Sequence, residues 1–88
     1  MGEKAAAKVR TYCSPGGNYT KRWVACFGSQ LSGFYQEEFE TFDEARWGVT
    51  DYQQSCQIVE IWDTQPLRLA FSFNQNRWPM AIDLRTES

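Results

Sequence analysis

Apolar and polar residues alternate between positions 67 and 74, in the stretch LRLAFSFN. A period of two is typical of a strand that buries one face and exposes the other. The side chains expected to face the core are Leu67, Leu69, Phe71 and Phe73. Those expected to face outward are Arg68, Ala70, Ser72 and Asn74. This stretch is therefore predicted to be a strand with one wet side.

Other runs of strand-forming residues are short and are separated by turn residues. They cover residues 9–14, 21–28, 33–40 and 57–63. The run 21–28 contains WVACF, which places apolar side chains on both faces and favours a central strand covered on both sides. A further alternation of Met80, Ile82 and Leu84 with smaller or polar residues suggests an additional short strand at the C-terminal end.

The pattern changes to a helical period between residues 41 and 56. Thr41 followed three residues later by Glu44 is the capping-box pattern that marks a helix start. Apolar residues then recur at spacings of three and four and form the predicted core stripe of the helix. They are Phe42, Ala45, Val49, Tyr52 and Cys56. Gly48 lies close to this stripe, where it would let the helix approach the sheet.

These elements follow one another in the order β-β-β-α-β-β, with the extra C-terminal strand as a sixth. We therefore expect an α+β domain, in which a mostly antiparallel sheet of five or six strands carries one helix on one face. The chain has 88 residues, enough for one small domain over 1–88. Residues 1–7 are expected to form a flexible N-terminal arm.

Composition and charge narrow the classes of function. The formal charge is −2, which gives no overall attraction to nucleic acid or to an anionic membrane. No apolar run approaches membrane-spanning length, and the N-terminal residues lack the apolar core of a secretory signal. Cys13, Cys26 and Cys56 are widely spaced, and we expect them to be reduced thiols of a cytoplasmic protein rather than to include a Cys13–Cys26 bridge.

The side chains that carry most catalytic chemistry are missing. The chain has no histidine, which is the commonest general base and the commonest metal ligand. Its three cysteines form no CxxC pair, so no zinc site is expected. Neither a phosphate-binding loop nor a dinucleotide fingerprint is present. We therefore expect no enzyme activity, no cofactor and no metal.

Trp47 is the residue that the predicted helix leaves unexplained, because it points away from the core stripe. One hypothesis is that its ring lies over an adjoining segment, such as the N-terminal arm, with Lys4, Lys8 or Arg10 in cation–π contact. The other hypothesis is that Trp47 anchors a protein interface, since Trp is enriched at binding hot spots. A homodimer is the simplest version of that interface.

Three functions stay open at this level. The favoured one is a small cytoplasmic binding protein that engages itself or a basic protein partner through the helix face around Trp47 and the acidic segment 37–44. The partner-binding candidates are Trp47, Asp43, Glu40, Glu38, Asp51 and Gln54. The second is single-stranded nucleic-acid binding through sheet aromatics and nearby bases. The candidates for that surface are Arg10, Tyr12, Lys21, Arg22 and Tyr35. The third is a small ligand in an aromatic-lined pocket between sheet and helix.

Overall fold

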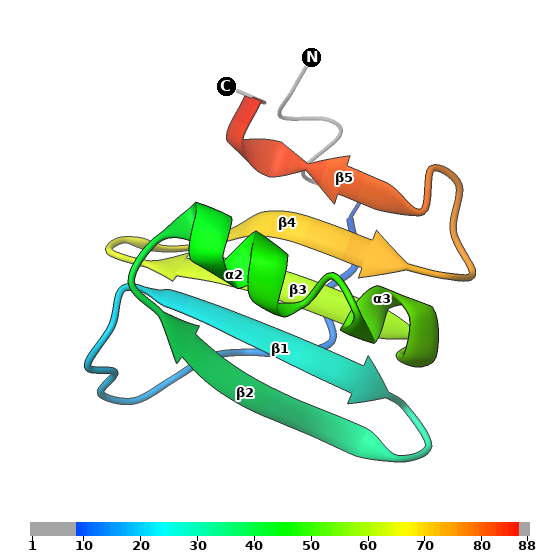
Figure 1. Ribbon diagram of the computed structural model, residues 1–88, viewed down its shortest axis with the longest axis horizontal. Coiled ribbons are helices and arrows are strands. Elements are labelled where there is room, and N and C mark those ends of the chain that lie inside the picture. Colours follow the sequence, from blue (N-terminus) through cyan, green and yellow to red (C-terminus); the bar gives the residue numbers. More distant parts are fainter. Residues whose placement is uncertain (1–8, 87–88) are drawn as a thin grey trace.

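Figure 1 shows the computed structural model of the chain, which describes residues 9–86 apart from the side chains of Gln53, Gln54 and Thr86. Within these residues five antiparallel strands form one sheet, in the order β2-β1-β3-β4-β5. The strands are β1 (Trp23–Ser29), β2 (Gly33–Phe39), β3 (Ile58–Thr64), β4 (Leu67–Asn74) and β5 (Ala81–Asp83). Helices α2 (Phe42–Gly48) and α3 (Tyr52–Ser55) cover one face, and the 3-10 helix η1 (Leu84–Thr86) follows β5. The predicted α+β class is confirmed.

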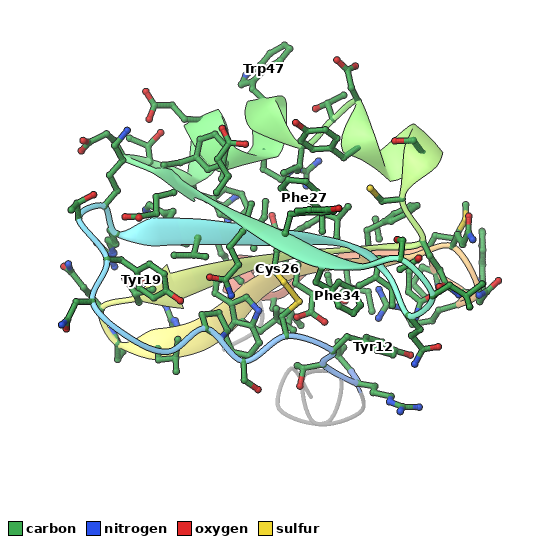
Figure 2. All side chains as sticks on the ribbon, turned by 90° about the horizontal axis from the view of Figure 1, so that it is seen from below. Tyr12, Tyr19, Cys26, Phe27, Phe34 and Trp47 are labelled. Carbon is green, nitrogen blue, oxygen red and sulfur yellow. A yellow bond between two sulfur atoms is a disulfide. The ribbon has the colours of Figure 1, made fainter. Side chains whose placement is uncertain are left out.

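The order along the described chain is β-β-α-β-β-β, so one predicted strand is missing and the additional one is present. The C-terminal strand suggested by the sequence is β5. The prediction of a strand over 9–14 is wrong, because these residues belong to an extended segment, 9–20, which crosses the sheet face opposite the helices (Figure 2). We call this segment the N-terminal strap. The arm predicted for residues 1–7 lies outside the described residues.

The sheet therefore has a helix side and a strap side, and both are covered. The main core lies on the helix side. Its buried members are Ala25, Phe42, Ala45, Val49, Val59, Ile61, Ala70, Phe71 and Phe73. On the strap side, Val24 and Cys26 are almost fully buried, which confirms that β1 is a central strand with two dry faces. The covered strap side also explains why Ser72 is buried although the alternation predicted it outside.

The pairing of β3 with β4 contains an irregularity that the alternation did not predict. Ile61 pairs with Phe71 and Trp62 pairs with Leu69, which leaves Ala70 as an extra residue on β4. An extra residue of this kind is a β-bulge, and it changes which side chains face the core. Ala70 is consequently buried, whereas Leu67, predicted to face the core, is 54% exposed near the turn.

The capping box at the start of α2 is confirmed. The Thr41 hydroxyl accepts from the backbone N–H of Glu44 at 3.1 Å, and the Glu44 carboxylate accepts from the backbone N–H of Thr41 at 3.3 Å. The single helix predicted over 41–56 is instead divided after Gly48, where a glycine is followed by the β-branched Val49 and Thr50. Tyr52 and Cys56 nevertheless pack against the core as the stripe predicted.

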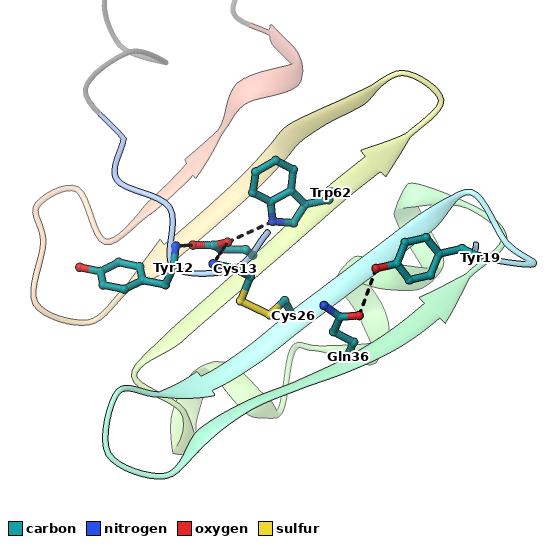
Figure 3. Close-up of a disulfide and its surroundings, with 7 residues drawn as sticks. Tyr12, Cys13, Tyr19, Cys26, Gln36 and Trp62 are labelled. Carbon is teal, nitrogen blue, oxygen red and sulfur yellow. Dashed lines mark hydrogen bonds between the residues drawn. A yellow bond between two sulfur atoms is a disulfide. The ribbon is translucent and has the colours of Figure 1, made fainter. Parts of the chain in front are cut away.

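The strap is attached at its middle by one covalent bond and one carboxylate (Figure 3). Cys13 and Cys26 form a disulfide, so the prediction that these two thiols are reduced is wrong. Cys56 is a free cysteine on the helix side. The fully buried carboxylate of Glu60 accepts the backbone N–H of Tyr12 at 2.7 Å and that of Cys13 at 3.2 Å. Glu60 is thereby joined to Tyr12 and Cys13, which lie 48 and 47 positions before it in the sequence.

Candidate functional site

The exposed side of α2 carries the largest aromatic surface on the helices. Trp47 is 81% exposed, which confirms that it points away from the core stripe. Figure 2 shows its indole projecting outward on the side opposite the strap. A hollow of about 360 Å³ is lined by Asp43, Arg46, Trp47 and Thr50. Asp43, Arg46 and Trp47 belong to α2 and Thr50 follows its end, and we call these four residues the Trp47 surface.

The two charged side chains of the Trp47 surface, Arg46 and Asp43, differ in their contacts within the protein. The guanidinium of Arg46 lies 4.1 Å from the centre of the Phe71 ring. Phe71 lies in β4 and is paired with Asp83 of β5, so the guanidinium of Arg46 lies over the β4 side of the sheet. Among the described residues, the Asp43 carboxylate has no hydrogen-bond or ion-pair partner. The hollow therefore presents one free carboxylate beside an indole ring.

The structure brings together only part of the predicted partner-binding set. Glu40 and Asp51 are exposed near the two ends of α2, outside the hollow. Gln54 lies in α3, and its side chain is outside the described part of the chain. Glu38 lies on the strap side, because neighbouring residues of a strand point to opposite faces. It therefore does not belong to the Trp47 surface.

Glu38 has a structural role of its own. Its carboxylate accepts the backbone N–H of Thr20 at 2.7 Å and that of Lys21 at 2.9 Å. The hydrogen bond from Lys21 is the main reason why the pKa of Glu38 is lowered. Glu38 thus fixes the turn by which the strap enters β1.

The hypothesis that Arg10 covers the ring of Trp47 does not hold for this arrangement. Arg10 belongs to the strap, and its guanidinium lies 4.9 Å from the centre of the Tyr12 ring. Lys4 and Lys8, the other two cations considered for that contact, lie outside the described residues. No contact between Trp47 and a strap residue explains its position.

The residues proposed for nucleic-acid binding do not form one surface. Tyr12 lies on the strap side, 6.5 Å from Phe34 between ring centres. Tyr35 lies on the helix side, 6.2 Å from its cross-strand partner Phe27. Arg22 donates two hydrogen bonds to Asp63, each at 2.8 Å, so its guanidinium is already paired. The strap also covers the sheet face that this hypothesis requires to be open (Figure 2).

The space between sheet and helices is filled by the aromatic side chains that were expected to line a pocket. Phe27 stacks on Tyr52 with ring centres 4.2 Å apart and planes at 10°. Trp23 meets Phe42 edge to face at 5.3 Å. These contacts are packing contacts of the core. The small-ligand hypothesis therefore has no support at this interface.

Arg46 and Thr50 are members of the Trp47 surface that the predicted partner-binding set did not include. The signal was present, because Arg46 lies three residues after Asp43 and directly before Trp47.

Among residues 9–86, no group of three His, Cys, Asp or Glu side chains is arranged to hold a metal ion. The helices described there include none that is both long and apolar enough to cross a membrane. Comparisons with protein-family models, with curated proteins and with solved structures found no match to this chain.

Proposed function

We propose that this chain is a small, non-catalytic binding protein whose Trp47 surface contacts a partner protein. The observation that carries the proposal is the 81% exposure of Trp47 on a helix whose start is fixed by a capping box. An exposed indole loses water favourably when a partner covers it, and it has few rotatable bonds to immobilise. Tryptophan is accordingly among the commonest residues at the centre of protein interfaces.

The charge around Trp47 favours a basic partner. Asp43 lines the hollow beside the indole, and Glu40 and Asp51, exposed near the two ends of α2, complete an acidic rim. The guanidinium of Arg46 lies over the Phe71 ring. A partner with Lys or Arg groups would be attracted to this rim and would associate faster at low ionic strength. Two copies of this chain meeting face to face would instead bring like-charged carboxylates together. A homodimer through this surface is therefore the second candidate.

The cellular location is part of the proposal. The sequence favours the cytoplasm, and this stays a prediction. The Cys13–Cys26 disulfide weighs against it, because such bonds persist mainly in oxidising environments.

A displayed library of random 12-residue peptides, selected on the oxidised protein, tests the proposal. The selected peptides should bind the wild type and the Trp78→Ala variant but lose at least about tenfold in affinity for Trp47→Ala. Trp78 is the matched control, because it is 87% exposed in the loop between β4 and β5. Equal losses for both variants, or none for Trp47→Ala, would contradict binding through the Trp47 surface.

Light scattering of the wild type and of Trp47→Asp decides between the two kinds of partner. A monomeric wild type agrees with a separate basic partner. A wild-type dimer that Trp47→Asp converts to a folded monomer would show that the surface binds a second copy.

A further inference from the structure

The protein already contains one arginine held between a tryptophan and a carboxylate. The guanidinium of Arg22 lies 5.3 Å from the centre of the Trp23 ring and donates from Nε and Nη2 to the two carboxylate oxygens of Asp63, at 2.8 Å each. Trp23 and Asp63 are paired across β1 and β3, so the sheet holds the two recognition groups side by side. This arrangement uses both properties of a guanidinium, its flat face and its edge of N–H donors.

Asp43 and Trp47 offer the same two groups without the arginine. They are one helical turn apart, so their side chains emerge on the same face of α2. Both line the hollow of about 360 Å³. The neighbouring Arg46 does not complete the set, since its guanidinium lies over the Phe71 ring on the sheet side of the helix.

From this correspondence we infer that the group of the partner that occupies the hollow is an arginine side chain. The inference rests on the proposed function and names the chemistry of its partner. The flat guanidinium stacks on the indole of Trp47, while its N–H edge donates to the Asp43 carboxylate. Thr50 adds an acceptor, because its hydroxyl hydrogen is used in the 2.8 Å bond to the carbonyl of Arg46 and its oxygen lone pairs remain.

Arginine fits this hollow better than lysine for a geometric reason. A guanidinium can stack through its face and bond through its edge at the same time, whereas an ammonium presents one compact charge that is more strongly hydrated. The hollow is open to solvent beside the exposed indole, so a cation that enters it must give up part of its water. A guanidinium is more weakly hydrated than an ammonium, so this loss of water costs arginine less than lysine. The Trp47 surface should therefore distinguish the two cations.

The test uses three peptides that differ in one side chain, acetyl-Gly-Gly-Xaa-Gly-Gly-amide with Xaa as arginine, lysine or citrulline. Citrulline keeps the flat shape of arginine but has no charge. Affinities are measured with the full-length oxidised protein by NMR, from the shift of the Trp47 indole N–H. We expect the arginine peptide to bind about 3–10-fold more tightly than the lysine peptide and at least about tenfold more tightly than the citrulline peptide.

Two conservative variants locate the binding. Asp43→Asn keeps the size of the side chain and removes its charge, and it should weaken the arginine peptide about 3–10-fold without weakening the citrulline peptide. Glu37→Gln removes an exposed carboxylate of β2 that neither lines the hollow nor belongs to the partner-binding set, and it should change arginine binding less than twofold. Equal binding of all three peptides, or equal effects of the two variants, would overturn the inference.

The result is separable from that of the proposed function. If library peptides need Trp47 but neither arginine nor Asp43, the partner surface stands and the arginine inference fails. If no library peptide needs Trp47, the proposed function itself fails.

Discussion

The carboxylate of Glu60 lies directly under the backbone of Tyr12, with 2.7 Å between Oε2 and the amide nitrogen. The other oxygen of the same carboxylate accepts from the Cys13 amide at 3.2 Å and from the indole N–H of Trp62 at 3.0 Å. Three donors therefore converge on one fully buried acid. A charged group in such a place is costly unless it is hydrogen-bonded, and here the strap supplies two of the three bonds.

Replacing Glu60 with glutamine should destabilise the protein in acid. In acid the wild-type carboxyl is protonated, but both of its oxygens keep lone pairs that can accept. Gln keeps one acceptor oxygen and turns an N–H donor toward one of the three donors around it. Below pH 4.5, the ordinary pKa of this carboxyl, we expect Glu60→Gln to lower the free energy of unfolding by about 1–2 kcal/mol. Denaturant unfolding under non-reducing conditions measures this difference.

The pH dependence of the same comparison follows from the pKa of Glu60. Burial raises that pKa above its ordinary value of 4.5, against the opposing effect of the hydrogen bonds. The folded protein therefore holds the Glu60 proton more tightly than the unfolded chain. The stability contributed by Glu60 is full below pH 4.5 and is lost as pH rises through the raised pKa. A difference between wild type and Glu60→Gln that grows with pH would contradict this.

Asp63 should show the opposite pH dependence. The hydrogen bonds from Arg22 are the main reason why its pKa lies below the ordinary value of 3.8. Its contribution to stability is present above pH 3.8 and is lost as pH falls through the lowered pKa. At pH 7 we expect Asp63→Asn to cost about 1–2 kcal/mol, less than a fully buried ion pair because the Arg22 side chain is 46% exposed.

Asp83→Asn is the comparison for Asp63→Asn. The Asp83 carboxylate pairs with Arg85 at 3.1 Å, but the two side chains are 35% and 43% exposed. Water screens such a pair, so we expect a loss below about 1 kcal/mol. Unfolding curves at pH 7 and pH 3 would show whether the more buried Asp63 contributes more to the free energy of unfolding than Asp83 does. Equal losses would mean that it does not.

The disulfide should contribute more stability than any single hydrogen bond of the strap. It joins residues 13 positions apart, and closing a loop of that length in the unfolded chain is worth about 3 kcal/mol. We expect the double variant Cys13→Ser, Cys26→Ser to lose about that amount. Cys56→Ser removes the free thiol instead and should cost less than about 1 kcal/mol.

Amide hydrogen exchange locates the effect of the disulfide. Loss of the bond should accelerate exchange at Tyr12 and Cys13, where the strap amides bond only to Glu60. The amides of Val59 and Ile61, in the helix-side core, should accelerate less, because they exchange only when the whole domain unfolds. Equal acceleration at all four sites would show that the disulfide holds the whole domain rather than the strap.

Gly48→Ala should be destabilising although alanine favours helices. A Cβ at position 48 would lie 2.6 Å from two ring atoms of Phe39, so the ring must move. We expect a net loss of about 1 kcal/mol, where an unobstructed helical site would gain up to about that amount. In a Phe39→Leu background the alanine should no longer be unfavourable. Thermal unfolding of the wild type, the two single variants and the double variant measures the coupling between positions 39 and 48. Additive effects would mean that the ring does not limit position 48.

Local patterns predicted the parts of the fold that local interactions decide. The Thr41–Glu44 cap, the start of the stripe at Phe42 and Ala45 and the two dry faces of β1 depend on spacing within one element. The close approach at Gly48 is confirmed by the Phe39 ring beneath it. The exposure of Trp47 followed from the same helical period.

The errors concern residues whose environment is set by distant segments. Residues 9–14 have the composition of a strand, yet Cys26 and Glu60 hold them on the face of the sheet instead of at its edge. Glu38 was grouped with Asp43 because they are close in sequence, but the alternation along β2 turns it to the opposite face. Clustering in sequence is a weaker guide to a surface than the period of the element that carries the residues.

The disulfide also closes a covalent ring in the chain, because it links Cys13 to the central strand β1 at Cys26. The basic residues Lys21 and Arg22 are exposed and lie inside that ring. Trypsin-like enzymes cleave the chain after such residues. A single cut there opens the ring but leaves both pieces joined through sulfur. The cleaved protein would run as one species until a thiol reductant is added, and its N-terminal piece would still lie across the sheet.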